Sequence, residues 1–158
     1  MMIDIHLSAP IPITKTHEIT LFDCGVHSLN HWLKKWAIKK DCSESSRTYV
    51  ISNGQTVIAY YCLGMGVIGR TETPKTHGRN LSDLIPILVL NRLAVHKDYH
   101  NQGIGRALLR DAVLRSLQAS KIAGVSALLV HALSEEAKRF YLSSGFRESP
   151  MGPRVLYL

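Results

Sequence analysis

The chain has 158 residues, enough for one domain with its own hydrophobic core. Hydrophobic residues make up 46% and charged residues 20%, which argues against disorder, and no apolar run is long enough to span a membrane. The 19 Lys and Arg against 12 Asp and Glu leave a net charge of +7, which favours either a polyanionic partner, such as nucleic acid or a phosphate-rich cofactor, or simply a solvated basic surface.

The first part of the chain predicts a strand, a helix and a hairpin. Its N-terminus lacks the basic lead of a signal peptide, and residues 3–8 are typical of a short strand. Between about residues 26 and 40, apolar side chains recur every three or four positions, which predicts a helix with one buried stripe. The stripe consists of Val26, Leu29, Leu33, Trp36 and Ala37. Residues 47–52 and 56–67 are predicted strands, and the Asn53-Gly54 dipeptide between them is a strong hairpin signal.

The second part alternates strands and helices. A loop is expected over residues 69–86, followed by a buried strand over 87–95 and a helix over 103–119. A further strand covers 127–131, Ser134 can cap the next helix, and residues 153–158 form a last strand. Because this alternation implies parallel pairing through crossovers, we predict a single α/β domain over residues 1–158 with a mixed sheet. Three widely spaced cysteines fit neither a metal site nor a disulfide framework, so we expect a reduced, cytoplasmic protein without a metal.

Two glycines stand where the strand over 87–95 gives way to the following helix. Gly103 and Gly105 allow a tight turn, and the amides of residues 102–107 would then point outward at the positive end of the helix dipole. Such a turn suits a pyrophosphate, and the cation of Arg106 would lie beside it. An ordinary helix start also explains a glycine pair. The pair lacks the remaining residues of the dinucleotide and NTPase phosphate motifs.

The residues around this turn resemble a known motif. Arg92-Leu-Ala-Val95, followed by Tyr99-x-x-x-Gly-x-Gly, is similar to the CoA-binding motif of the GNAT acetyltransferases, although His100 stands where that family usually has Gln or Arg. The resemblance implies the GNAT fold, with a mixed central sheet, flanking helices and a cleft for acetyl-CoA as cosubstrate. The residues implied to bind CoA are Leu93, Ala94, Val95, His100, Gln102, Gly103, Ile104, Gly105, Arg106, Ala107 and Lys138.

A second motif contains the candidate catalytic residue. Ala137-Lys-Arg-Phe-Tyr141, followed by Gly145-Phe146, is similar to the GNAT segment in which a helical tyrosine faces the CoA sulfur. A tyrosine with an ordinary pKa of about 10 stays protonated and can protonate a departing thiolate. We therefore predict that Tyr141 is the catalytic acid. The alternative is a core tyrosine whose hydroxyl bonds to the backbone.

The N-terminal half narrows the resemblance to one branch. Phe22-Asp-Cys-Gly25, Leu29-Asn30, Trp32-Leu33 and Arg47-Thr-Tyr-Val50 resemble the GNAT toxins of type II toxin–antitoxin modules, while Asn91 and His96 depart from that pattern. The resemblance implies acetylation of the α-amino group of aminoacyl-tRNA, a homodimer, and an antitoxin with a ribbon-helix-helix DNA-binding half. A tRNA substrate fits the positive charge. Candidate tRNA-binding residues are Lys34, Lys35, Lys39, Arg70, Lys75, Arg79 and Arg92.

Two other functions fit parts of the pattern. The same enzyme chemistry can serve a polyamine, an aminoglycoside or a protein N-terminus, but cationic small amines favour an acidic pocket and the chain has only 12 acids. A non-enzymatic nucleic-acid binder would interleave aromatic residues with its Lys and Arg as stacking platforms. Aromatic residues are 7% of the chain, and the periodicity places Trp32 and Trp36 on the apolar side of a helix.

Overall fold

The computed structural model describes residues 7–43, 46–69 and 84–158. They form two compact units, one made of residues 1–64 with 90–113 and the other of 65–89 with 114–158. Each unit is described by itself below, and the interpretation of the chain as a single domain stays a prediction. No helix in the described ranges is long and apolar enough to cross a membrane. Arg70, Lys75 and Arg79 lie outside these ranges, as does most of the strand predicted over residues 3–8.

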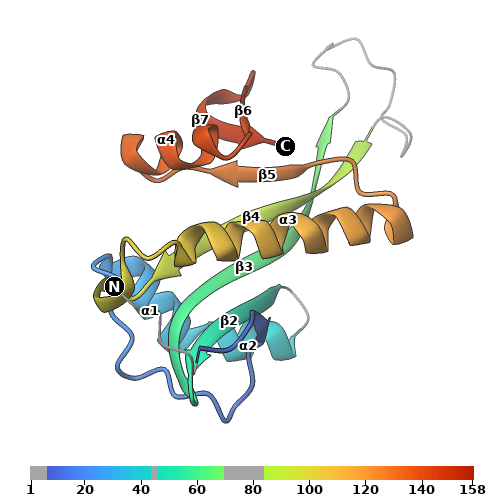
Figure 1. Ribbon diagram of the computed structural model, residues 1–158. Coiled ribbons are helices and arrows are strands. Elements are labelled where there is room, and N and C mark those ends of the chain that lie inside the picture. Colours follow the sequence, from blue (N-terminus) through green and yellow to red (C-terminus); the bar gives the residue numbers. More distant parts are fainter. Residues whose placement is uncertain (1–6, 44–45, 70–83) are drawn as a thin grey trace. The chain divides into compact units, whose positions relative to one another are not determined.

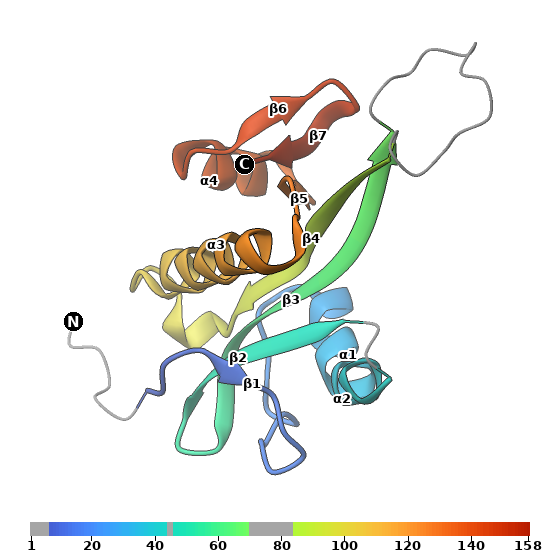
Figure 2. The same cartoon turned by 90° about the vertical axis from the view of Figure 1, so that its right-hand side faces the viewer.

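The first unit is a sheet with helices on both faces. Its strands are β1 (Ile11–Pro12), β2 (Arg47–Asn53), the start of β3 (Thr56–Gly69) and the end of β4 (Leu84–Val95), hydrogen-bonded in that order. Figure 2 shows α1 (His27–Lys35) and α2 (Ala37–Cys42) on one face of this sheet and α3 (Ile104–Ala123) on the other. Tyr60 and Tyr61 of β3 bond to helices on opposite faces of the sheet, because neighbouring strand residues point to opposite faces. The Tyr60 hydroxyl donates to Leu29 O of α1 at 2.7 Å, and the Tyr61 hydroxyl donates to Asp111 of α3 at 2.5 Å.

The structure confirms the hairpin predicted from Asn53-Gly54, but its two-residue loop begins one position later than predicted. Asn53 pairs with Thr56, so the two loop residues are Gly54 and Gln55. Gly54 has a φ of 63°, and among the described residues with a side chain only Asn101 has a positive φ. The turn therefore needs a glycine at its first central position, while Asn53 ends the strand.

The predicted helix over residues 26–40 is divided at Trp36. The backbone there has a φ of −115°, and it ends α1 and begins α2. The division lets both Leu33 and Ala37 reach the core, where they are fully buried, while the indole of Trp36 turns outward and stays 37% exposed. Val26 precedes the helix and is also exposed. The stripe prediction was therefore right for Leu29, Leu33 and Ala37 and wrong for Val26 and Trp36.

The second unit contains the remaining strands and α4 (Glu135–Ser143), with β5 (Leu128–His131), β7 (Gly152–Tyr157) and β6 (Arg147–Ser149) following β4 in the sheet (Figure 1). Leu88 N donates to Ala127 O and Ser126 N to Pro86 O, so these segments run in the same direction, as the strand–helix alternation predicts. β7 is antiparallel to both β5 and β6. The sheet is mixed, as predicted, but β6 is an additional strand that the sequence did not indicate.

Candidate active site

β4 ends at Val95, and the backbone N–H of this residue points away from the neighbouring strand β3. His96 N donates to Ile58 O of β3 at 2.7 Å. Because successive strand residues direct their backbone groups to opposite edges, the Val95 N–H points away from β3. The Val95 carbonyl lies on that same edge and accepts from His100 Nε2 at 2.7 Å. Since a carbonyl only accepts, Nε2 carries the proton. His100, predicted to bind CoA, thus fastens the end of the strand to the turn.

The turn that follows forms the predicted helix start. After a short 3-10 helix, Lys97–Tyr99, the backbone takes positive φ values at Asn101 (63°) and Gly103 (80°). α3 then begins, with Ala107 N bonded to Gly103 O at 3.1 Å. Amides in the first turn of a helix have no partner within the helix, so they form a ready anion site. Ile104 is buried and anchors the turn, while Arg106 and Ala107 are exposed and Gln102 and Gly105 half-buried.

The predicted CoA-binding residues of β4, Leu93, Ala94 and Val95, lie close to this turn. Ala94 is buried in the core beneath α1, and the side chains of Leu93 and Val95 are half-buried. Alternation along β4 places Leu93 and Val95 on the face opposite to Ala94. That face is the one on which Tyr61 meets α3. The structure thus gathers ten of the eleven predicted CoA-binding residues at the end of β4 and the start of α3, within the first unit. The eleventh, Lys138, belongs to the second unit.

Tyr141 lies on α4 in the second unit. The Ser134 hydroxyl caps this helix by accepting from Ala137 N at 3.1 Å, as predicted. The ring of Tyr141 packs edge-on against Phe140 and Phe146, with centroids 5.2 and 5.5 Å away, and is only 7% exposed. Burial raises the pKa of Tyr141 to about 12, so its hydroxyl is protonated throughout the neutral range.

The hydroxyl of Tyr141 has no hydrogen-bond partner among the described residues. A purely structural tyrosine would be expected to bond to the backbone, as Tyr60 does with Leu29. Lys138, one turn before Tyr141, forms an ion pair with Glu148 at 3.2 Å and is 14% exposed. Its ammonium is therefore already engaged within the second unit. The Tyr141 hydroxyl is thus not tied to the backbone, whereas the Lys138 ammonium is paired with Glu148.

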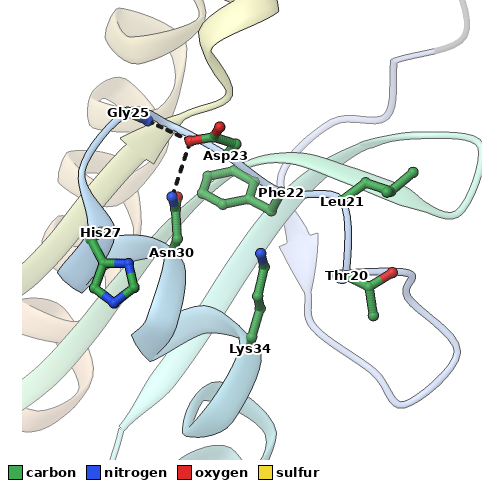
Figure 3. Close-up of a pocket in the computed structure, with 8 residues that line it drawn as sticks. All are labelled: Thr20, Leu21, Phe22, Asp23, Gly25, His27, Asn30 and Lys34. Atoms are coloured by element: carbon green, nitrogen blue, oxygen red, sulfur yellow. Dashed lines mark hydrogen bonds between the residues drawn. The ribbon is translucent and has the colours of Figure 1, made fainter.

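Asp23, Cys24, Gly25 and Asn30, which belong to the toxin-like pattern, are joined by hydrogen bonds to one another and to Lys97 after β4. We call these five residues the clasp. Figure 3 shows two of its bonds: Asp23 Oδ1 accepts from Gly25 N at 2.9 Å and from Asn30 Nδ2 at 3.1 Å. Asn30 Oδ1 in turn accepts from Cys24 N at 2.8 Å. The bond from Gly25 N is that of an Asx turn, in which an Asp side chain accepts from the backbone two residues later, here with a Gly25 φ of 91°.

The clasp also holds the segment that follows β4. Lys97 N donates to Asp23 O at 2.8 Å, and Lys97 Nζ lies 3.1 Å from Asp23 Oδ2. Bonds from Gly25 N, Lys97 and Asn30 lower the pKa of Asp23 to about 2, so the carboxylate stays ionised. The toxin resemblance included Asp23, Cys24, Gly25 and Asn30, but it indicated neither their contacts nor the part of Lys97. The Asp-x-Gly spacing was the available signal.

A pocket of about 510 Å³ opens beside the clasp. Figure 3 shows Lys34 and Leu21 on its wall together with Asp23, Gly25 and Asn30 of the clasp. Its lining consists of Thr20, Leu21, Phe22, Asp23, Gly25, His27, Asn30 and Lys34. Of the predicted tRNA-binding residues, Lys34 lies here. Arg92 is elsewhere in the first unit, with its guanidinium 4.5 Å from the ring centre of Trp32.

The two departures from the toxin pattern have defined positions. Asn91 faces the neighbouring strand, where a Cβ on Gly64 would lie 2.8 Å from Asn91 Nδ2. Asn91 therefore occupies the space that Gly64 leaves open. His96 packs edge-on against Phe22 and Tyr99, and its Nδ1 accepts from Asp98 N at 3.0 Å. Both residues are part of the packing at the end of β4, and neither disrupts the strand.

Residues 44–148 match the family described as acetyltransferase (GNAT) domain, and the chain belongs to this family. It is therefore an acetyltransferase with the GNAT fold, as the two motifs predicted. Among its relatives, the tRNA-acetylating toxin of Mycobacterium tuberculosis is 37% identical over 151 residues, which cover 96% of this chain and 91% of the relative.

Solved structures extend the similarity. The toxin AtaT complexed with acetyl-methionyl-tRNAfMet has a TM-score of 0.84 and 26% identity, covering 96% of this chain and 94% of that one. A mutant AtaT bound to the C-terminus of the antitoxin AtaR and acetyl-CoA has a TM-score of 0.81 at 26% identity, covering 96% and 92%.

Proposed function

We propose that this acetyltransferase moves the acetyl group of acetyl-CoA to the α-amino group of aminoacyl-tRNA and thereby blocks translation. The observation that carries the proposal is the 37% identity, along nearly the whole chain, to a tRNA-acetylating toxin. The similar AtaT structures with acetyl-CoA and with acetylated methionyl-tRNA support the same donor and acceptor. An acetylated α-amino group cannot attack in peptide-bond formation, so the modified tRNA is useless to the ribosome.

The donor turn has the chemistry to hold acetyl-CoA. We propose that the amides of residues 102–106 bind the pyrophosphate and that Leu93 and Val95 line the pantetheine and acetyl group. The Ala107 amide, which the sequence also suggested, is already bonded to Gly103 O. The Val95 N–H, directed away from β3, is the donor that we assign to the thioester oxygen. His100 supports this arrangement indirectly, because its bond to the Val95 carbonyl fixes the peptide plane next to that amide.

The reaction then needs one attack and one proton donor. The neutral amine attacks the thioester carbon, and the negative charge that develops on the oxygen is stabilised by the Val95 N–H. The C–S bond breaks, the sulfur takes the proton of Tyr141, and the former amine releases its extra proton to water, from which Tyr141 is reprotonated. An α-amino group has a reference pKa of about 7.7–8.0, so much of it is neutral without a strong general base.

The raised pKa of Tyr141 has two opposing effects on this step. It keeps the acid protonated, but it makes the proton harder to release than that of a tyrosine in water. The same apolar surroundings that disfavour tyrosinate also disfavour a free thiolate, so the leaving sulfur becomes more basic as it departs. The sulfur therefore becomes basic enough to take the proton of Tyr141 only while the C–S bond is breaking. Proton transfer then occurs in the transition state.

The proposal includes two partners and a location. The AtaT–AtaR structure supports an antitoxin as partner, and the resemblance adds a ribbon-helix-helix half for it and a homodimer for the enzyme. Because its substrate belongs to translation, the protein acts in the cytoplasm. The pocket beside the clasp contains the Lys34 ammonium, which suits the phosphates of an acceptor end.

Incubation of the purified protein with radiolabelled acetyl-CoA and a mixture of charged and uncharged tRNA tests the reaction. Label is expected only on charged tRNA, and mild alkaline cleavage of the aminoacyl ester should release it as N-acetyl amino acid. Label that appears on peptides or polyamines but not on RNA would contradict the proposed acceptor and leave an acetyltransferase of another purpose.

A further inference from the structure

The exposed indole of Trp36 is surrounded by cations. The ammonium groups of Lys35, Lys39 and Lys40 lie 5.9, 5.5 and 5.5 Å from the centre of its ring. The ring lies at the junction of α1 and α2 and is 37% exposed. We call Trp36, Lys35, Lys39 and Lys40 the indole patch. It combines a flat aromatic surface with a high local positive charge.

The other tryptophan shows what a structural indole looks like in this fold. Trp32 is 8% exposed and stacks on Tyr60, with ring centres 5.9 Å apart and planes inclined by 10°. The Arg92 guanidinium also lies 4.5 Å from the centre of the Trp32 ring. Trp32 is a member of the core cluster beneath α1, and Trp36 is not. Packing in this core cluster therefore does not account for the second indole.

Two lysines of the indole patch, Lys35 and Lys39, have no acidic partner among the described residues. Lys35 and Lys39 are four residues apart, a spacing at which like charges destabilise a helical segment. Of the described residues, none provides a carboxylate in ion-pair contact with either ammonium. The negative face of the indole offsets part of the repulsion, because ring quadrupoles attract ammonium groups. An anion placed beside the ring would offset more of it.

We propose that the indole patch binds unpaired nucleotides of the tRNA, with a base stacked on Trp36 and the lysines on the flanking phosphates. This inference rests on the proposed function, and it names a binding site for the RNA. An unpaired nucleotide matches both features, since its base has a π-face and its backbone an anion on each side. An acidic peptide would match the lysines alone and leave the indole unused.

Binding of uncharged tRNA and of a single-stranded ribo-oligonucleotide, followed by tryptophan fluorescence, tests the patch without acetylation. The chain has two tryptophans, and Trp32 is buried, so stacking should quench the emission of Trp36. Trp36→Leu should remove the quenching and weaken binding about tenfold, whereas Trp36→Phe should retain part of the affinity. The control is Tyr157→Leu, because Tyr157 is equally exposed at 37% and lies in the second unit.

The lysines are tested by salt. Changing Lys35 and Lys39 to Gln together should lower the slope of log affinity against log salt by about 1.4, the value for two phosphate contacts on a single strand. Lys121→Gln, an exposed lysine at the end of α3, should leave the slope unchanged. Circular dichroism melting establishes that every variant is folded.

Three results would overturn the inference: unchanged RNA affinity in Trp36→Leu, the same loss in Tyr157→Leu, or quenching by a polyglutamate peptide but not by RNA. The last would assign the patch to an acidic protein segment. Failure to acetylate charged tRNA would contradict the proposed function alone, because uncharged RNA reports on the patch directly.

Discussion

Gly103 offers a quantitative test of the donor turn. Its φ of 80° is in the left-handed region, and a Cβ added there would meet no atom within 4 Å. Gly103→Ala therefore introduces no clash, and its cost is that of a left-handed L-residue, about 1–2 kcal/mol. If the turn relaxes to avoid this cost, the amides of residues 102–106 move, and binding of acetyl-CoA should weaken by about 5- to 30-fold.

Gly54→Ala is the matched control. Gly54 has a φ of 63° and open space around its missing Cβ, but it lies in the β2–β3 hairpin. Both variants should lose a similar 1–2 kcal/mol of stability in total, roughly 2–8 °C in melting temperature for a chain of this size. Calorimetric titration with acetyl-CoA should separate them, with weakened binding only in Gly103→Ala. Equal affinities in the two variants would refute the assignment of the turn to the donor.

Three further predictions concern the acid and the clasp. Tyr141→Phe should keep acetyl-CoA affinity and lower kcat by about 10²–10⁴-fold, and full activity would exclude Tyr141 from the mechanism. The same variant should resist alkali better. In the wild-type protein, the pKa of Tyr141 is raised from 10.0 to about 12, so its neutral hydroxyl contributes stability that is complete below pH 10 and is lost as the pH rises toward 12. The total loss is about 3 kcal/mol for a buried group. Identical alkaline unfolding curves for the wild type and Tyr141→Phe would contradict this. Asn30→Ala removes both bonds of the Asn30 side chain and should cost about 1–3 kcal/mol in urea unfolding, while Gln118→Ala, at an exposed position of α3, should cost almost nothing.

Local patterns predicted most of the architecture because they depend on short-range physics. The apolar period, the glycine at the hairpin and the Ser134 cap each concern residues within a few positions of one another. The structure confirms the glycine and the cap, and it confirms the apolar period at Leu29, Leu33 and Ala37. The turn at Gly103 was predictable for the same reason. A glycine before an apolar helical repeat permits the left-handed backbone that such a turn requires, here with a φ of 80° at Gly103.

The missed features depend on contacts between distant segments. The kink at Trp36 follows from the need of Leu33 and Ala37 to reach one core, which helical periodicity alone does not indicate. β6 has three residues and exists because β7 pairs with it. The clasp joins Asp23 to Lys97 across more than 70 residues, and such a pairing cannot be read from either segment separately.

The clasp has a consequence for how such enzymes can diversify. Asp23 and Asn30 direct their polar atoms to internal partners, so changes at these positions would disturb the end of β4. Thr20, Leu21 and Lys34 line the same pocket without taking part in those bonds. A library of variants at Thr20, Leu21 and Lys34 would therefore change the lining of the pocket, while the bonds of Asp23 and Asn30 keep the surrounding backbone in place. In the proposed enzyme, where this pocket receives the acceptor end, the preference among acceptors would then change in few substitutions.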